Sequence, residues 1–230
     1  MLPVHSIRLT DDTPEVDARK LASSLGAQFA FFARQPSPRL LIALFAVAIG
    51  VRVAHAAWRP ADALLAFAVF AYWPFQEWFL HRYLLHLKPQ RIFGRTFDPQ
   101  FARAHRAHHR RPWIVETTFL PTRVVLGLIP VTLFGWWLAT PDIGLAATGV
   151  AASAAAATLY EWTHYLTHST YVPRTAYVRR IFRNHRLHHF KNERHWFAFT
   201  VPLIDRALRT DPDPNAVDKS ETVRTLGVDE

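Results

Sequence analysis

Cysteine is missing from the sequence, and the first 38 residues lack the apolar core of a signal peptide. Without cysteine the chain cannot form a disulfide scaffold, a thiolate nucleophile, an iron–sulfur cluster or a zinc finger. Low-complexity tracts are also missing, and 50% of the 230 residues are apolar, which excludes a disordered chain. We therefore expect one folded unit whose N-terminal segment is retained.

Acidic residues are scarce beside basic ones. The chain has 18 Asp and Glu against 27 Lys and Arg, so its formal net charge is +9. Such a charge favours an anionic partner, either nucleic acid or a membrane surface. The sequence contains neither an arginine-rich recognition helix nor a repeated aromatic–basic pattern, so we expect a membrane and no nucleic acid.

Two runs without any charged residue occupy positions 124–141 and 143–160. Each has 18 residues, and as a helix each would be about 27 Å long, close to the thickness of the bilayer hydrocarbon. Only Asp142 separates them, and Pro141 beside it predicts a tight reversal. The pair is therefore predicted to be a transmembrane hairpin, with a second arm rich in small residues, as in closely packed membrane helices.

An earlier pair of apolar segments is less uniform. It covers residues 40–58 and 63–76 and is interrupted by Arg59 and Pro60. We expect two further membrane helices here, with Arg52 reaching towards an interface and Trp58 anchored in one. A buried helical pair of a soluble domain is the alternative.

The basic residues predict the orientation of these helices. Segments 81–117 and 162–210 carry eight and nine Lys or Arg, whereas the turns 58–62 and 140–143 carry only Arg59. The positive-inside rule then places both termini and both basic segments in the cytoplasm of a multi-pass membrane protein. We expect a polar cytosolic segment at 1–38, a membrane domain at 39–210 and a flexible tail at 211–230.

Ten of the 13 histidines fall in four short clusters, all within the basic segments. In an ideal helix, the H-x2-HH and H-x3-H spacings project their imidazoles from one face. The H-x4-H pair is less regular, because its members lie about 140° apart and need a kink or different metals. The four clusters are His81 and His86; His105, His108 and His109; His164 and His168; and His185, His188 and His189.

Imidazole is the commonest metal ligand at neutral pH, and ten ligands suit two ions rather than one. The clusters also repeat: the dipeptide Glu-Trp at 77–78 precedes the first, and the same dipeptide at 161–162 precedes the third. Two such halves facing each other would enclose a dinuclear site at the cytoplasmic interface. Glu77 and Glu161 lie one turn before a ligand histidine and could accept its second ring N–H. His195 has no partner at ligand spacing and is expected at a surface or an interface.

These motifs together resemble the fatty acid hydroxylase/sterol desaturase superfamily of membrane-bound di-iron enzymes. The stretch EWFLHRYLLHLKP at 77–89, the box HYLTH and the following HRLHHFKN are similar to the fatty acid 2-hydroxylase branch. The resemblance covers roughly residues 65–210. It implies an all-α bundle of about four transmembrane helices, with a helical cytosolic cap that holds two iron ions on the ten clustered histidines.

The resemblance also implies a reaction. One oxygen atom of O2 would enter a lipid C–H bond, with electrons from an external ferredoxin, cytochrome or reductase. Zinc can replace iron on purification, since the same nitrogen ligands bind it. The chain departs from the family pattern in Trp196-Phe197-Ala198-Phe199, where glycines are common, and at 204–210, and these departures concern the substrate-facing surface more than the metal site.

Several alternatives remain open at this point. A carotenoid-ring hydroxylase or a sterol oxidase or desaturase would share the histidine boxes, although carotenoid hydroxylases tend to have four residues within the third box, against three here. A metal transporter or metal-binding membrane protein would need ligands within its spans, and the runs 124–141 and 143–160 contain no histidine. A two-zinc hydrolase would need a carboxylate base, for which only Glu77 and Glu161 are available.

Overall fold

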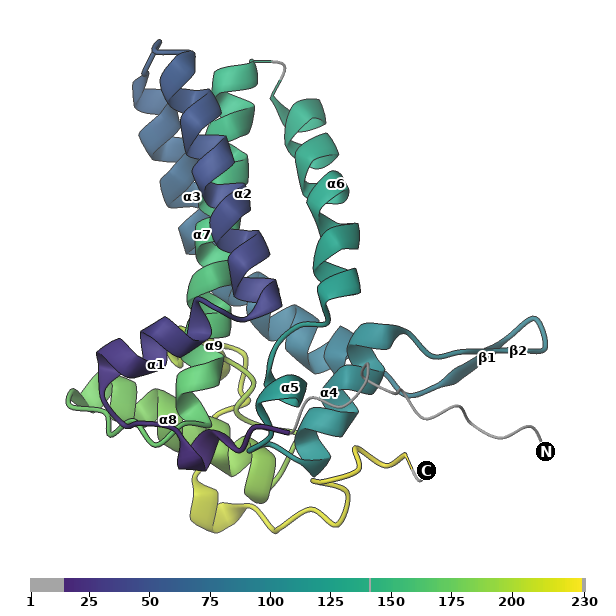
Figure 1. Ribbon diagram of the computed structural model, residues 1–230. Helices are drawn as coiled ribbons and strands as arrows, with labels where there is room; N and C mark the ends of the chain where they lie inside the picture. Colours follow the sequence, from purple (N-terminus) through teal and green to yellow (C-terminus); the bar gives the residue numbers. More distant parts are fainter. Residues whose placement is uncertain (1–14, 141, 229–230) are drawn as a thin grey trace.

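The computed structural model describes residues 15–140 and 142–228, and most of them are helical (Figure 1). Four long helices stand side by side: α2 (Pro36–Ala54), α3 (Pro60–Phe79), α6 (Thr122–Ala139) and α7 (Ile143–Thr167). Each belongs to a helical stretch that is long and apolar enough to cross a membrane. The predicted all-α membrane bundle is confirmed, and the reversal expected at Pro141 falls outside the described residues.

The remaining elements form a cap at one end of the bundle (Figure 1). The six-residue η2 (Leu80–Leu85) is a π-helix that continues α3 into this cap. A short antiparallel hairpin, β1 (Gln90–Ile92) and β2 (Arg95–Phe97), follows it. The other cap elements are η1 (Ala18–Lys20), α1 (Leu25–Phe32), α4 (Gln100–Arg110), α5 (Val115–Thr118), α8 (Ala176–Phe190), α9 (Leu203–Ala207) and η3 (Pro214–Ala216).

Helix α7 is the centre of the bundle, and its small residues explain why. Ala151, Ala154 and Ala156 are buried, and side chains of this size let neighbouring helices approach closely. Helix α6 stands further from its neighbours (Figure 1). It meets α7 where the indole of Trp136 lies against Gly149 and donates a hydrogen bond from Nε1 to Ser153 Oγ at 3.0 Å.

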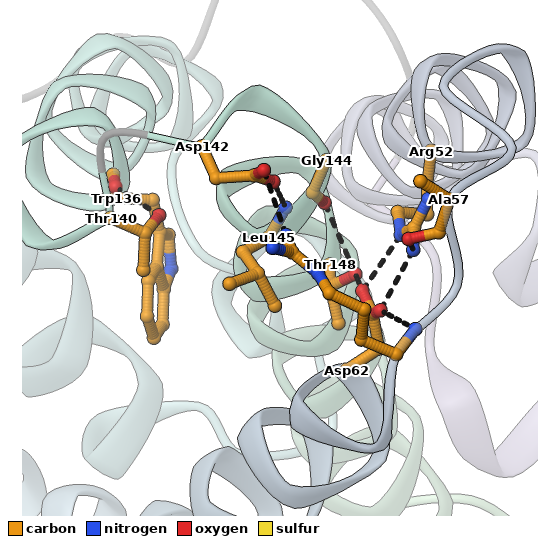
Figure 2. A network of polar contacts seen from close by, with 10 residues as sticks. Arg52, Ala57, Asp62, Trp136, Thr140, Asp142, Gly144, Leu145 and Thr148 are labelled. Carbon is orange, nitrogen blue, oxygen red and sulfur yellow. Dashed lines mark hydrogen bonds and ion pairs between the residues drawn. The ribbon is translucent and has the colours of Figure 1, made fainter.

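A buried ion pair joins three helices at the end of the bundle away from the cap. Arg52 of α2 donates from Nε and Nη2 to the two carboxylate oxygens of Asp62 on α3, each at 2.7 Å. Thr148 of α7 donates to the same carboxylate at 2.6 Å, and Arg52 also donates to the Ala57 carbonyl (Figure 2). The expectation that Arg52 reaches out to the interface was therefore wrong, because the Asp62 carboxylate satisfies its charge within the bundle.

The two ends of the described chain both pack against the cap. Phe32 of α1 lies in a buried cluster with Val115 and Tyr165. At the other end, Val223 and Leu226 are only 3% and 4% exposed. The tail that was expected to be flexible is therefore packed over its described residues, 211–228. Its mainly polar composition gave no indication of this, because only a few apolar side chains hold it.

Candidate metal centre

The structure brings the ten clustered histidines together as two adjoining groups of five. Within each group, one ring nitrogen of every histidine lies within 4.8 Å of those of the others. The groups touch where the rings of His109 and His189 stack at 4.2 Å. The first group is His81, His86, His105, His109 and His188, and the second is His108, His164, His168, His185 and His189.

Each group of five contains one histidine from the opposite half of the sequence. In each H-x2-HH motif the outer two histidines, one helical turn apart, join the histidine pair of their own half. The middle one joins the opposite group: His108 of α4 lies with the second group, and His188 of α8 lies with the first. The two halves therefore interlock, rather than each facing the other with a complete set.

The irregular first pair is resolved by the π-helix η2. Its widened turns close i→i+5 hydrogen bonds, so residues five apart lie above one another. His81 and His86 have this separation, and their ring centroids are 5.0 Å apart in the same group. The sequence left open whether a kink would bring His81 and His86 together or whether they would reach different metals. The structure shows an irregular helix that puts both in one group.

The ring nitrogens converge in a way that suits cations. The Nε2 atom of His108 lies 3.0 Å from that of His164 and 3.1 Å from that of His168. Each ring nitrogen carries one proton or one lone pair, so His108 cannot form an ordinary hydrogen bond with both. Metal–nitrogen bonds of about 2.1 Å would place ligands at right angles about 3.0 Å apart. The donor set therefore fits a transition metal in each group.

Backbone carbonyls orient three rings of the first group. The Nδ1 atoms of His81, His188 and His109 lie 2.7, 2.7 and 3.0 Å from the carbonyl oxygens of Phe197, His195 and Val223. If Nδ1 donates in each, the Nε2 lone pair is left for a metal. Burial lowers the pKa of His188 to about 4, which keeps the ring neutral at pH 7. His195 contributes its carbonyl here, while its imidazole belongs to neither group.

Neither predicted carboxylate bonds to an imidazole among the described residues. Glu77 accepts hydrogen bonds from the amides of Phe199 and Thr200 and from the Thr200 hydroxyl. Glu161 accepts from Ser37 and from the amide of Leu120. The expected contact with the second N–H of a clustered histidine was wrong: Glu77 binds the loop that carries Phe199, and Glu161 joins the start of α2 to the segment before α6.

The loop at 196–200 is the part of the site that the sequence did not identify. Phe199 is fully buried, and its ring lies 4.6 Å from that of His81 in the first group and 4.9 Å from that of His164 in the second. Asp205 fixes the same loop by accepting from the amides of Phe197 and Ala198. The departure from glycine noted in the sequence thus corresponds to buried aromatic side chains that pack on the histidines.

An apolar cavity of about 780 Å³ runs along the bundle and reaches the first group. Leu65 and His81 of the α3–η2 stretch both line it, and 16 residues of helix between them correspond to about 24 Å. Helix α6 supplies the opposite wall through Val125, Leu128 and Ile129. A cavity of this size and lining is suited to a long apolar molecule that enters from the bilayer.

Comparison with known proteins gives three consistent results. The sequence model of the fatty acid hydroxylase family matches residues 66–210. The dihydroceramide fatty acyl 2-hydroxylase FAH1 of Arabidopsis thaliana is 27% identical over 150 residues, which are 65% of this chain and 61% of that protein. The fatty acid 2-hydroxylase of Homo sapiens is 25% identical over 138 residues, which are 60% of this chain and 37% of that one.

Among solved structures, full-length Scs7p, of which only the hydroxylase domain is visible, has a TM-score of 0.62 at 22% identity. The match covers 79% of this chain and 68% of that chain, and it shows a common fold. The aligned part of this chain spans less than two thirds of the length of the Arabidopsis relative.

Proposed function

The chain belongs to the fatty acid hydroxylase family, and on this premise we propose that it is a membrane oxidoreductase that hydroxylates a C–H bond of a fatty acyl chain or a related lipid. The observation that carries the proposal is the apolar cavity, whose lining includes His81 of the first histidine group. The relatives named as 2-hydroxylases make the carbon next to the acyl carbonyl the first position to examine.

We further propose that the ten histidines of the two groups hold two iron ions, with O2 as co-substrate and an external ferredoxin, cytochrome or reductase as electron donor. Bound iron would supply O2 activation: with two electrons from the donor and two protons from the solvent, one oxygen atom enters the C–H bond and the other leaves as water. The same imidazole set also suits zinc.

The chain's own residues would position the substrate and protect the site. The apolar walls on α3 and α6 would align an acyl chain along the bundle so that one of its carbons lies beside His81. Phe197 and Phe199 pack on the histidines and would keep water from the reacting atoms. The carbonyls that accept from Nδ1 would hold the rings in the orientation needed for ligation.

The orientation in the membrane belongs to the same proposal. The basic segments that form the cap would lie in the cytoplasm together with both termini, by the positive-inside rule. An external electron donor would then reach the metal centre from the cytoplasm, while the lipid enters the cavity from the bilayer.

Lipid mass spectrometry on a host that expresses the protein under air tests the activity. A new lipid heavier by one oxygen atom, found with the wild type and lost in His188→Ala, supports hydroxylation, whereas a lipid lighter by two hydrogen atoms indicates desaturation. His55→Ala, on the connection between α2 and α3, is the matched control and should behave as the wild type.

Metal analysis of the purified variants separates the site from the reaction. His108→Ala and His188→Ala should each lower the metal content per chain while the protein still inserts in the membrane, because each removes a ligand from one group. Full metal content and full activity in both variants would refute the ligand assignment. If metal is bound but no acyl product forms, carotenoids and sterols are the substrates to supply next.

A further inference from the structure

The hairpin β1–β2 projects sideways from the cap, near the end of the bundle (Figure 1). All six residues of its strands are exposed. Phe93 at its tip is entirely exposed, and Ile92 and Phe97 are about half exposed. An isolated hairpin of this size is marginally stable in water, so one that also presents three large apolar side chains needs a further partner.

The turn residue strengthens this conclusion. Phe93 and Gly94 connect the strands with φ angles of 48° and 75°, and a two-residue turn with positive φ at both positions favours Asn, Asp or Gly at the first. A bulky L-residue in this region is disfavoured by steric contact of its Cβ. The chain places a large aromatic side chain where local backbone preference opposes it, which is understandable if the ring makes contacts outside the chain.

The position of the hairpin identifies the surroundings of that ring. Helix α3 ends at Phe79 and continues into the cap as η2, which ends at Leu85, and β1 begins five residues later at Gln90. Leu84 and Leu85 at the end of η2 still line the apolar cavity of the bundle, and five extended residues reach at most about 18 Å, so the hairpin starts near the level at which the bundle meets the cap. Headgroups and the outer part of the acyl chains occupy this level in a bilayer.

The charges on the hairpin match such surroundings. Arg91 and Arg95 lie on the two strands, and both are exposed. Arginine side chains pair with phosphate through two parallel hydrogen bonds. Basic residues with apolar neighbours are the usual composition of segments that lie in the interface of an anionic membrane.

We propose that the β1–β2 hairpin is an interfacial membrane anchor. Phe93 lies at the boundary of the hydrocarbon, and Arg91 and Arg95 contact the phosphates of anionic lipids. The anchor would hold the cap against the bilayer beside the cavity, part of whose lining is Leu84, Leu85 and Phe101. It requires only that the four helices span the membrane, so it stands or falls independently of the proposed reaction.

The absence of cysteine allows a direct test, because a single introduced cysteine is the sole labelling site. The full chain with Phe93→Cys is spin-labelled and reconstituted in vesicles of phosphatidylcholine with phosphatidylglycerol. The label's collisions with oxygen, which concentrates in lipid, are compared with those with a water-soluble nickel complex. Leu133→Cys on the exposed side of α6 is the lipid control, and Asn215→Cys in the exposed turn η3 is the aqueous control.

The proposal expects the ratio of oxygen to nickel collisions at position 93 to lie between the ratios at positions 215 and 133, as for a site at the boundary of the hydrocarbon. It should clearly exceed the ratio at position 215, because oxygen concentrates in the bilayer and the nickel complex is excluded from it. A ratio equal to that at position 215 would overturn the proposal. Spin–spin broadening between labels would overturn it as well, because it would show that a second copy of the chain covers the tip.

Two further variants separate anchoring from folding of the hairpin. Phe93→Asn suits the turn and should keep the hairpin formed, yet a label at Phe97→Cys in this background should move towards water. Replacing Arg91 and Arg95 by Gln should have the same effect only in vesicles that contain phosphatidylglycerol. No change in either variant would contradict the roles assigned to these three side chains.

Discussion

The packing contact between Trp136 and Gly149 provides the sharpest quantitative test of how α6 and α7 pack in the bundle. A Cβ atom added at Gly149 would lie less than 3.0 Å from three atoms of the Trp136 indole. These atoms belong to a rigid ring whose Nε1 donates a hydrogen bond to Ser153. Overpacking of this kind costs about 1–3 kcal/mol. We therefore expect Gly149→Ala to destabilise the protein, although alanine is the better helix former.

Helix preference can be removed from the result by a matched variant. Gly127 lies within α6, and a Cβ there would meet no atom within 4 Å beyond its own helix backbone among the described residues. Both Gly→Ala changes gain about 1 kcal/mol of helix preference. The difference between the two variants then isolates the steric cost, and it should be about 1–3 kcal/mol in favour of Gly127→Ala.

Equilibrium unfolding in mixed detergent micelles, followed by helical circular dichroism, measures this difference. In a Trp136→Leu background the penalty of Gly149→Ala should largely disappear, since the ring that it meets is gone. Equal stability of Gly149→Ala and Gly127→Ala would refute the close contact between Trp136 and Gly149. A penalty that persists without the indole would show that another neighbour resists the added methyl group.

Three other predictions concern the rest of the molecule. A chain that ends at Asp211 loses the Val223 carbonyl, which lies 3.0 Å from Nδ1 of the proposed ligand His109, so it should lose metal to a chelator about 10–100-fold more readily; unchanged metal loss on elemental analysis would contradict this. Because burial lowers the pKa of His188 to about 4 from 6.5, the unfolded chain binds protons that the folded one excludes. The metal-free protein should therefore lose stability as the pH falls from 6.5 towards 4, and an unfolding midpoint constant over this range would be inconsistent with buried neutral rings. Asp62→Asn leaves the buried guanidinium of Arg52 without its counter-charge, whereas Arg59→Gln breaks the exposed ion pair with Asp142. Asp62→Asn should therefore lower the unfolding midpoint more than Arg59→Gln. Equal effects of the two variants would argue against burial of the Arg52–Asp62 pair.

The bundle and the clustered histidines could be predicted because both depend on simple sequence patterns. Long apolar runs identify membrane helices whatever their neighbours, and helical spacing puts the outer histidines of each H-x2-HH motif on one face. The packing of the tail could not be predicted in this way. Its composition is typical of a mobile segment, and among its described residues, 211–228, only two apolar side chains, Val223 and Leu226, are buried.

Irregular backbone accounts for the other differences. Apart from the H-x4-H spacing, which was compatible with a kink or with different metals, the sequence at 80–85 contains nothing that distinguishes a π-helix from an α-helix, yet this turn decides whether His81 and His86 share a group. The hairpin lacks the Asn-Gly signal that usually marks a two-residue turn, since Phe93 takes the first position. Both irregularities lie between the end of a predicted span and the next regular helix, where periodicity gives least information.

The crossing of the middle histidines has a consequence for how the two groups behave. His108 lies on α4 between two histidines of the first group but belongs to the second, and His188 on α8 lies between two histidines of the second group but belongs to the first. A rotation or shift of either helix would therefore disturb both groups at once. Phe199 adds a second link, because its ring packs on His81 of one group and on His164 and His185 of the other. Metal bound in one group would fix the helices that complete the other, so the two should fill cooperatively and not as independent sites.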